Sequence, residues 1–351
     1  MARPADRFSE HVARVCASGA DARTLRLELL AELDRLVPFD AYAWVLTDPE
    51  TSVGSAPLAD VPALSELPRL IRLRYVTALN RWTSLTRTPV ALLSESTGGE
   101  LSRSLLWREL LSRHGVSDVA SSVFRDRNGC WAFLELWRTG GRTFADADVD
   151  VLRALVPPVT VALRRAQSRF FAAPPGRGPF PIGPAVLLLS ADLEVVRRTA
   201  GTEDQLRLLV PRDDEGPPVP AGAYNVAAQL LAREAGVDDN APMARVHVAG
   251  GRWVTLRAAR LDEGDPQPGG DIAVTIESSS ARERIDLFGR ACGLSEREHE
   301  LLGRLAAGGD TREVAGAMFL SPHTVQDHLK SVFAKTGTRS RRALLARALG
   351  T

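Results

Sequence analysis

The sequence contains little that could cross-link the chain or hold it in a membrane. Its 351 residues include three cysteines, Cys16, Cys130 and Cys292, whose spacing matches neither a disulfide framework nor a zinc site. No apolar run approaches the roughly 20 residues that a membrane span needs, and the opening Met-Ala-Arg-Pro lacks the apolar core of a signal peptide. We therefore expect a cytoplasmic protein with reduced thiols and no membrane partner.

Motifs of the common enzyme classes are also missing. The chain has no GxxxxGK[ST] phosphate loop, no GxSxG elbow, no HExxH zinc motif and no kinase signature. His299-Glu300 has no second histidine four residues along, and His247 alternates with two valines, so its side chain is expected to point away from the core. We predict no catalytic residue, no metal site and no cofactor, and hence that the protein is not an enzyme.

The charge is nearly balanced overall but is unevenly distributed. An apolar fraction of 44% and a net charge of +1 are typical of a globular protein, and the length suits about two to three domains. From residue 312 onward, however, seven bases stand against two acids, a net charge of +5. A local excess of this kind indicates a face that binds a polyanion.

The stretch from Ser321 to Lys335 has the pattern of a capped helix. Ser321 can accept hydrogen bonds from the first free amides, and Pro322 suits the first helical position, where an N–H has no partner. Gly337 suits the left-handed residue that ends a helix. Apolar residues recur on one face: Val325, Leu329, Val332 and Phe333. The opposite face carries side chains that can bond to DNA: His323, Gln326, Asp327 and Lys330.

Three more helices are predicted around this one. Two capping boxes mark helix starts: Ser295 with Glu298, and Asp310 with Glu313. Ser340 can cap a last helix, Gly308-Gly309 ends the first, and Phe319-Leu320 forms a tight turn before Ser321. Four short helices, two of them joined by a tight turn, predict a helix-turn-helix unit.

These residues also carry a resemblance to a known family. The matching positions are Leu294-Ser-x-Arg-Glu298, Leu302, Gly308, Glu313-Val-Ala315, Leu320-Ser-Pro-His-Thr-Val325, His328, Phe333, Lys335, Gly337 and Arg339-Ser-Arg341. Residues 294–349 thereby resemble the DNA-binding domain of LuxR/NarL/GerE-type bacterial transcription regulators. The resemblance implies that a homodimer binds double-stranded DNA, with RNA polymerase as a candidate partner. Thr336 and Thr338 stand where the family usually has apolar residues, which predicts a looser helix end.

The chemistry of the side chains suggests a role for each predicted DNA contact. Gln326 can bond to adenine and Lys330 to guanine, while Asp327 is disfavoured near phosphates unless it accepts from a cytosine amino group. The resemblance places base contacts at these same three positions. His323 lies on the same face. Phosphate contacts are expected from the remaining polar and basic residues: Thr324, Lys335, Arg339 and Arg341.

The first half of the chain predicts an α+β domain over residues 1–172. The expected helices are 22–37, 64–79, 101–112 and 146–165, and the expected strands are 41–46, 90–93, 119–125 and 130–137. The last two strands flank Asn128-Gly129, a strong hairpin signal. The order of elements, together with Val37-Pro-Phe-Asp-Ala-Tyr-Ala-Trp44, resembles GAF domains of actinobacterial regulators.

A second α+β block follows a break that is rich in proline and glycine. Residues 173–184 are predicted to form a linker because this composition cannot continue a helix. Residues 185–280 predict two strands, a helix over 226–235 and three further strands, an order that resembles a PAS domain. With the helix-turn-helix domain at 285–351, the fold class is multidomain α+β: a GAF-like and a PAS-like domain, then an all-α tetrahelical domain.

Tryptophans gather in the GAF-like domain. Trp44, Trp82, Trp107 and Trp131 could wall a pocket for a small apolar ligand of unknown identity, or they could simply fill the core. Cys130 could anchor a chromophore, but a hairpin cysteine without a function is the more common case.

Three hypotheses follow for the whole chain. The first is a sequence-specific DNA-binding transcription regulator that responds to a small molecule or a protein through its sensor domains. The second is a protein-interaction scaffold whose sensor folds bind no ligand; fully packed domain cores would favour it. The third is an enzyme tethered to DNA, which would need convergent catalytic groups that the sequence does not contain at recognisable spacing.

Overall fold

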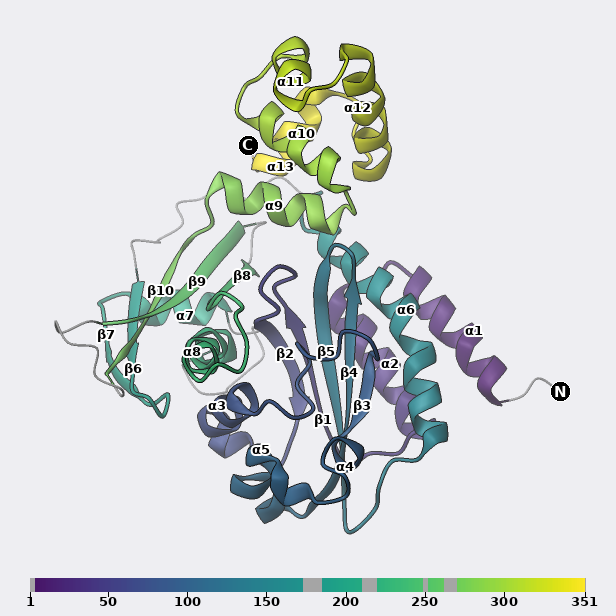
Figure 1. Cartoon of the computed structure of the whole chain (residues 1–351), viewed down its shortest axis with the longest axis vertical. Coiled ribbons are helices and arrows are strands. Elements are labelled where there is room, and N and C mark those ends of the chain that lie inside the picture. Colours follow the sequence, from purple (N-terminus) through teal and green to yellow (C-terminus); the bar gives the residue numbers. More distant parts are fainter. Residues whose placement is uncertain (1–3, 173–184, 210–219, 249–251, 262–269, 351) are drawn as a thin grey trace. The chain divides into compact units, whose positions relative to one another are not determined.

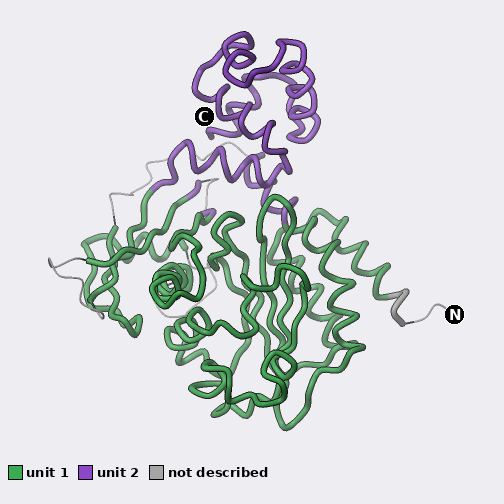
Figure 2. The backbone as a smooth tube through the Cα atoms, viewed as in Figure 1, with its two compact units in different colours: residues 1–163, 181–246, 254–277 green, residues 164–180, 247–253, 278–351 purple. Residues whose placement is uncertain are grey.

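The structure is a computed structural model, and it describes residues 4–172, 185–209, 220–248, 252–261 and 270–350 (Figure 1). The predicted linker at 173–184 lies outside the described residues. The chain forms two compact units (Figure 2). Unit 1 comprises residues 1–163, 181–246 and 254–277, and unit 2 comprises residues 164–180, 247–253 and 278–351.

The first sheet of unit 1 is antiparallel, with the strand order β2-β1-β5-β4-β3. Its strands are β1 (Ala41–Thr47), β2 (Gly54–Asp60), β3 (Val90–Leu92), β4 (Val116–Asp126) and β5 (Gly129–Thr139). The hairpin predicted around Asn128-Gly129 is present: β4 and β5 are joined by a turn at Arg127-Asn128, and Gly129 is the first residue of β5. Strand β2 is not apparent in the sequence, because Pro57 lowers its strand signal; an edge strand tolerates a proline that a central strand would not.

Helices accompany both faces of this sheet. They are α1 (Pro4–Ala17), α2 (Ala22–Leu36), α3 (Leu67–Val76), α4 (Leu93–Ser96), α5 (Leu105–Glu109) and α6 (Asp146–Arg169). The single helix expected over 101–112 is wrong. The chain instead forms 3₁₀ turns at Leu101–Arg103 and Leu111–His114 on either side of α5. Ser104 has an extended backbone and caps α5 through its side chain, which interrupts the helix while its leucines stay packed on the core.

The second sheet of unit 1 has the order β7-β6-β10-β9-β8. Its strands are β6 (Ala185–Leu189), β7 (Val195–Arg198), β8 (Met243–Val248), β9 (Arg252–Arg260) and β10 (Ile272–Ser278), with helices α7 (Thr202–Leu209) and α8 (Ala221–Glu234). Helix α8 is apolar on almost every side and is largely buried, packing against α3 and β2 of the first sheet. The Asn225 side-chain amide donates to the carbonyl of Gly54 at 3.0 Å.

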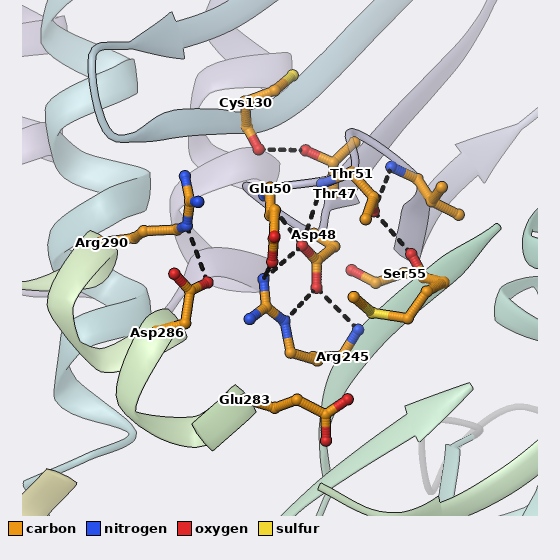
Figure 3. Close-up of polar contacts among 12 residues, drawn as sticks. Thr47, Asp48, Glu50, Thr51, Ser55, Cys130, Arg245, Glu283, Asp286 and Arg290 are labelled. Atoms are coloured by element: carbon orange, nitrogen blue, oxygen red, sulfur yellow. Dashed lines mark hydrogen bonds and ion pairs between the residues drawn. The ribbon is translucent and has the colours of Figure 1, made fainter. Parts of the chain in front are cut away.

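Two buried ion pairs also join the two sheets within unit 1. The Arg245 guanidinium bonds to Asp48 at 2.7 Å and 2.8 Å, and both side chains are at most 1% exposed (Figure 3). Burial alone would raise the pKa of the Asp48 carboxyl, but its bonds to Arg245 outweigh burial and hold that pKa below its usual range. Arg81 similarly donates to Asp238 at 3.0 Å. The two sheets therefore share one interior, while the domain limits expected from the sequence stay a prediction.

Unit 2 is built mainly from five helices. They are α9 (Ala281–Ala291), α10 (Glu296–Ala306), α11 (Thr311–Met318), α12 (Pro322–Thr336) and α13 (Arg341–Leu349). Their core consists of side chains that are almost fully buried: Leu287, Phe288, Leu301, Leu302, Leu305, Val314, Met318, Val325, Val332 and Leu344. The end of α6 and residues 247–253 belong to the same unit.

Candidate nucleic-acid interface

Local capping fixes the limits of α12. The Ser321 hydroxyl accepts from the Thr324 amide at 3.1 Å, and Pro322 occupies the first turn. At the other end Gly337 adopts φ +65° and its amide donates to the carbonyl of Phe333. Both capping boxes predicted for α10 and α11 are present, and Ser340 caps α13. The four predicted helices and their starts are confirmed.

The two faces of α12 divide as the apolar spacing predicts. Val325, Leu329 and Val332 are at most 6% exposed. On the other face the side chains of His323 and Lys330 are 86% and 75% exposed, and Gln326 is exposed as well. A helix that buries one face and exposes polar side chains on the other can enter a DNA major groove.

Asp327 forms a small charge cluster on the exposed face. Its carboxylate accepts from Lys330 Nζ at 2.9 Å and lies 3.2 Å from Nδ1 of His323. The hydrogen bond from Lys330 is the main reason that the pKa of Asp327 is lowered. The acid therefore stands between two potential donors to DNA, and a base or phosphate must compete with it for Lys330.

Lys335 has a partner within the domain. Its ammonium group bonds to Glu298 Oε2 at 2.6 Å, and the Ser331 hydroxyl donates to Oε1 of the same carboxylate at 2.6 Å. Burial alone would raise the pKa of Glu298, but hydrogen bonds from Lys335, Ser331 and the Ser295 amide lower it to about 2. Glu298 thus completes the capping box of α10 and also fixes the second half of α12.

The other predicted phosphate contacts lie in different environments. Arg339 is exposed, whereas Arg341 donates to the carbonyl of Gly309 at 2.7 Å and so ties α13 to the start of α11. The Thr324 hydroxyl lies 2.9 Å from that of Ser321. A surface pocket is lined by Arg341, Arg342, Leu345 and Ala346. Most of these groups remain accessible to a polyanion.

The looser helix end predicted from Thr336 and Thr338 is wrong. Both residues are buried, at 4% and 7% exposure, and their hydroxyls lie 2.8 Å apart. The Thr336 hydroxyl also bonds to the carbonyl of Val332 at 2.8 Å. Because each hydroxyl has a partner, the pair can replace apolar residues without loosening the helix.

The tryptophans predicted for ligand binding do not surround one site. Trp44 is fully buried and stacks on Phe124, and its partner in register is Leu134. Trp82 instead stacks on Phe133, the neighbour of Leu134, and therefore lies on the opposite face of the sheet. Trp107, half-buried, donates to the carbonyl of Val116 at 2.8 Å, and Trp131, 2% exposed, donates to Asp126 at 3.0 Å.

A polar group missed by the sequence reasoning lies on the Trp82 face. Strand register aligns Ala43, Glu135, Ser121 and Ala91 in one row across four strands. Arg74 from α3 forms an ion pair with Glu135, and the Asn80 amide donates to Ser121 at 2.9 Å. Three buried polar atoms have no hydrogen-bond partner among the described residues: Arg74 Nε, Asn80 Oδ1 and Trp137 Nε1. The one available signal was Glu135, an acid within an apolar strand.

His247, which the sequence predicts to point away from the core, is half-buried. Its ring stacks on Phe170 with centroids 4.0 Å apart and meets Trp253 edge-on. Burial lowers the pKa of His247 to about 4, with a further contribution from Arg284. Cys130 is 1% exposed, and burial raises the pKa of its thiol. Both groups are therefore neutral at pH 7.

The described residues contain neither a metal-binding cluster nor a membrane-spanning helix. No group of three or more His, Cys, Asp or Glu side chains could hold a metal ion. No described helix is both long and apolar enough to cross a bilayer.

Comparison with known proteins addresses the C-terminal region. Residues 293–348 match the model of a family described as bacterial regulatory proteins, luxR family. A probable HTH-type transcriptional regulator of Streptomyces halstedii, GfsR, is 37% identical over 89 residues, which are 24% of this chain and 37% of that protein. The match therefore spans well under half the length of that relative.

Two solved structures resemble the whole chain at a low level. A crystal structure of Escherichia coli SdiA is 14% identical with a TM-score of 0.40, covering 98% of this chain and 97% of that one. SdiA in complex with octanoyl-rac-glycerol is 13% identical with a TM-score of 0.31, covering 98% and 94%. These scores are too low to establish a shared fold. Together with the capped helices, the family match identifies residues 293–348 as a luxR-family helix-turn-helix domain, which implies DNA binding.

Proposed function

We propose that the whole chain is a sequence-specific transcription regulator whose DNA binding is controlled by input to unit 1. The observation that carries this proposal is α12, a capped helix with a buried apolar face and an exposed face of hydrogen-bonding side chains, inside a luxR-family domain. Gln326 and Lys330 would read base edges, and Arg339 would contact phosphate. Lys335 and Arg341 would act mainly by holding the helices in place, because each already bonds within the domain.

A homodimer would bring two copies of α12 to successive half-sites. Leu344 cannot serve the dimer interface, because it is fully buried in the domain core. Leu345 is half-buried and lines a surface pocket with Arg342, so the outer face of α13 is the better candidate. RNA polymerase remains a proposed partner of the same domain.

An aromatic cluster in unit 2 supports a route for regulation. Phe171, just after α6, stacks on Trp253 of β9 with centroids 5.2 Å apart and meets Phe288 of α9 at 5.3 Å. The Phe171 carbonyl also accepts from Arg347 of α13 at 3.3 Å. Phe171, which follows helix α6, and Trp253, at the start of strand β9, thus pack against helices of the DNA-binding region. A shift of α6 or β9 would change the population of the arrangement that binds DNA.

Two inputs are compatible with the interior of the first sheet. Small-molecule input is supported by the row around Glu135, where Ala43 and Ala91 are only partly buried and three polar atoms have no hydrogen-bond partner within the described part of the chain. Protein input is the second candidate. It is supported by Trp44, which stacks on Phe124, and by Trp82, which stacks on Phe133, because these rings fill the core.

Two measurements test the proposal. The full chain should select a discrete DNA site from a random duplex pool, and it should bind that site far more tightly than random sequence at physiological salt. Native mass spectrometry should then detect any retained small molecule. An Ala43→Phe variant would exclude it, whereas Ala59→Phe, which extends the same row at its exposed end, serves as the control. Failure to select any site would contradict the regulator; selection without retained mass would favour protein input.

A further inference from the structure

Phe319 is unusual within the described part of unit 2. Its side chain is 94% exposed, and no other large apolar residue described in this unit is exposed. Leu320, its neighbour, is half-buried, and Met318 is 2% exposed. Exposure of a single apolar side chain is common on protein surfaces, so the exposed ring of Phe319 becomes informative only together with its backbone conformation.

The backbone at Phe319 adds a second observation. Phe319 has φ +55° and ψ +43°, the left-handed conformation that favours glycine or asparagine. The turn requires this conformation, because the Leu320 amide bonds to the carbonyl of Ala315 at 2.9 Å and the Phe319 amide to that of Gly316 at 3.2 Å. A bulky residue is therefore held in a strained conformation without a compensating contact in the free domain. Such strain often marks a functional position.

The place of Phe319 in the turn indicates what covers it. It is the C-cap of α11 and lies two residues before Ser321, the N-cap of α12, whose first turn carries the exposed His323. When the start of a recognition helix enters the major groove, the residues just before it face the edge of that groove. The surface there is deoxyribose and phosphate, and the sugars offer apolar C–H groups to an aromatic ring.

The isolation of Phe319 argues against a protein partner at this place. Protein interfaces have an apolar core of several residues, whereas Phe319 is the one exposed large apolar side chain in the described part of unit 2. A single exposed ring fits a sugar-phosphate edge better than the face of another protein.

We propose that Phe319 is a DNA contact whose ring packs on the deoxyribose backbone at the edge of the groove that α12 enters. This inference rests on the proposed DNA-binding function. The contact carries no charge and touches no base edge, so it adds affinity for duplex DNA of any sequence without adding salt dependence.

The test compares Phe319→Asn, which suits the left-handed turn but removes the ring, with Phe319→Tyr, which keeps the ring and the strain. Fluorescence anisotropy with the selected duplex and with a random 30-base-pair duplex, at several salt concentrations, gives affinity and salt slope. The Asn variant should bind both duplexes about fivefold or more weakly with an unchanged slope, because the apolar contact is lost. It should also unfold at the same or a higher temperature, because strain is relieved. The Tyr variant should bind as the wild type does.

Each outcome bears on the inference. Equal DNA affinity of the Asn variant and the wild type would overturn it, and a weakened self-association measured by sedimentation would then assign the ring to a second copy of the chain. Loss of affinity together with a lower unfolding temperature would mean that Phe319 supports the fold rather than DNA. If the wild type binds neither duplex, the proposed function fails and the inference with it. If the wild type binds and only the Asn result is negative, the inference alone fails.

Discussion

The helical domain of unit 2 and the two sheets of unit 1 are held together by contacts of different range. In the helical domain the polar contacts are mostly local: Ser295 with Glu298, Asp310 with Glu313, and Asp327 with Lys330 all lie three residues apart. In unit 1 the pair Asp48–Arg245 joins residues 197 positions apart, and Arg81–Asp238 joins residues 157 apart. The helical domain can therefore form element by element, whereas the interior shared by the sheets needs both halves of the chain.

The largest effect is expected from breaking the long-range pair. Asp48→Ala removes the fully buried partner of the Arg245 guanidinium, while the ion pair with the half-exposed Glu50 stays, and should lower the free energy of unfolding by about 3–5 kcal/mol. Urea unfolding followed by circular dichroism measures the change. The control is Asp150→Ala, which breaks an exposed pair with Arg153 and should cost less than about 1 kcal/mol. Similar losses from both variants would contradict a buried link between the sheets.

A smaller effect is expected from Glu298, which joins α10 to α12. Its pKa is about 2 in the folded protein and near 4.5 when unfolded, so its stabilising contribution is present above pH 4.5 and is lost as the pH falls toward 2. The full contribution is up to about 3 kcal/mol. Hydrogen exchange of the α12 amides at pH 5 and pH 3 should show this loss in the wild type. In Glu298→Gln protection should already be low at pH 5 and change less between the two values.

Replacement of individual α12 side chains should separate base readers from structural cations. Lys330→Ala should weaken binding to the selected duplex by about 1–3 kcal/mol and relax specificity at one base pair. Arg339→Ala should weaken binding to all duplexes alike and flatten the salt slope. Arg341→Ala should also lower the unfolding temperature, because it removes the bond to Gly309. Gel shifts at several salt concentrations distinguish the three variants. Identical binding profiles for all three would refute the separation of base readers from structural cations.

The smallest effect is expected at Asp327. Asp327→Asn removes the acid that holds Lys330 and His323, so it should strengthen binding to random duplex several-fold while reducing the preference for the selected site. The ratio of the two dissociation constants measures this preference. An unchanged ratio would mean that Asp327 does not take part in discrimination.

The sequence predicted well where neighbouring residues decide the structure. Ser321, Pro322 and Gly337 mark both ends of α12, and Asn128-Gly129 marks the β4–β5 turn. It failed where distant packing decides. The segment 101–112 has the periodicity of one helix, but its leucines are positioned by the sheet and by α3, and the chain breaks at Ser104 to fit them.

In the candidate site, too, the sequence predicts the features that neighbouring residues decide and misses those that depend on distant packing. The exposure of Gln326 and Lys330 follows from helical spacing and could be read from the sequence. The partners of Lys335 and Arg341 could not, because Glu298 and Gly309 lie 37 and 32 residues away. Trp44 and Trp82 were grouped by residue type alone. Strand alternation and the packing of the α3–β3 loop put them on opposite faces of the first sheet.

The sequence by itself determined the capped helices of the C-terminal domain and the polar face of α12, because caps and helical periodicity act over three to four residues. Only the tertiary structure decided which cations remain free for DNA, that Phe319 stands exposed in a strained turn, and that Asp48 meets Arg245. Those outcomes depend on which distant side chains occupy the same small volume, and no local pattern encodes that.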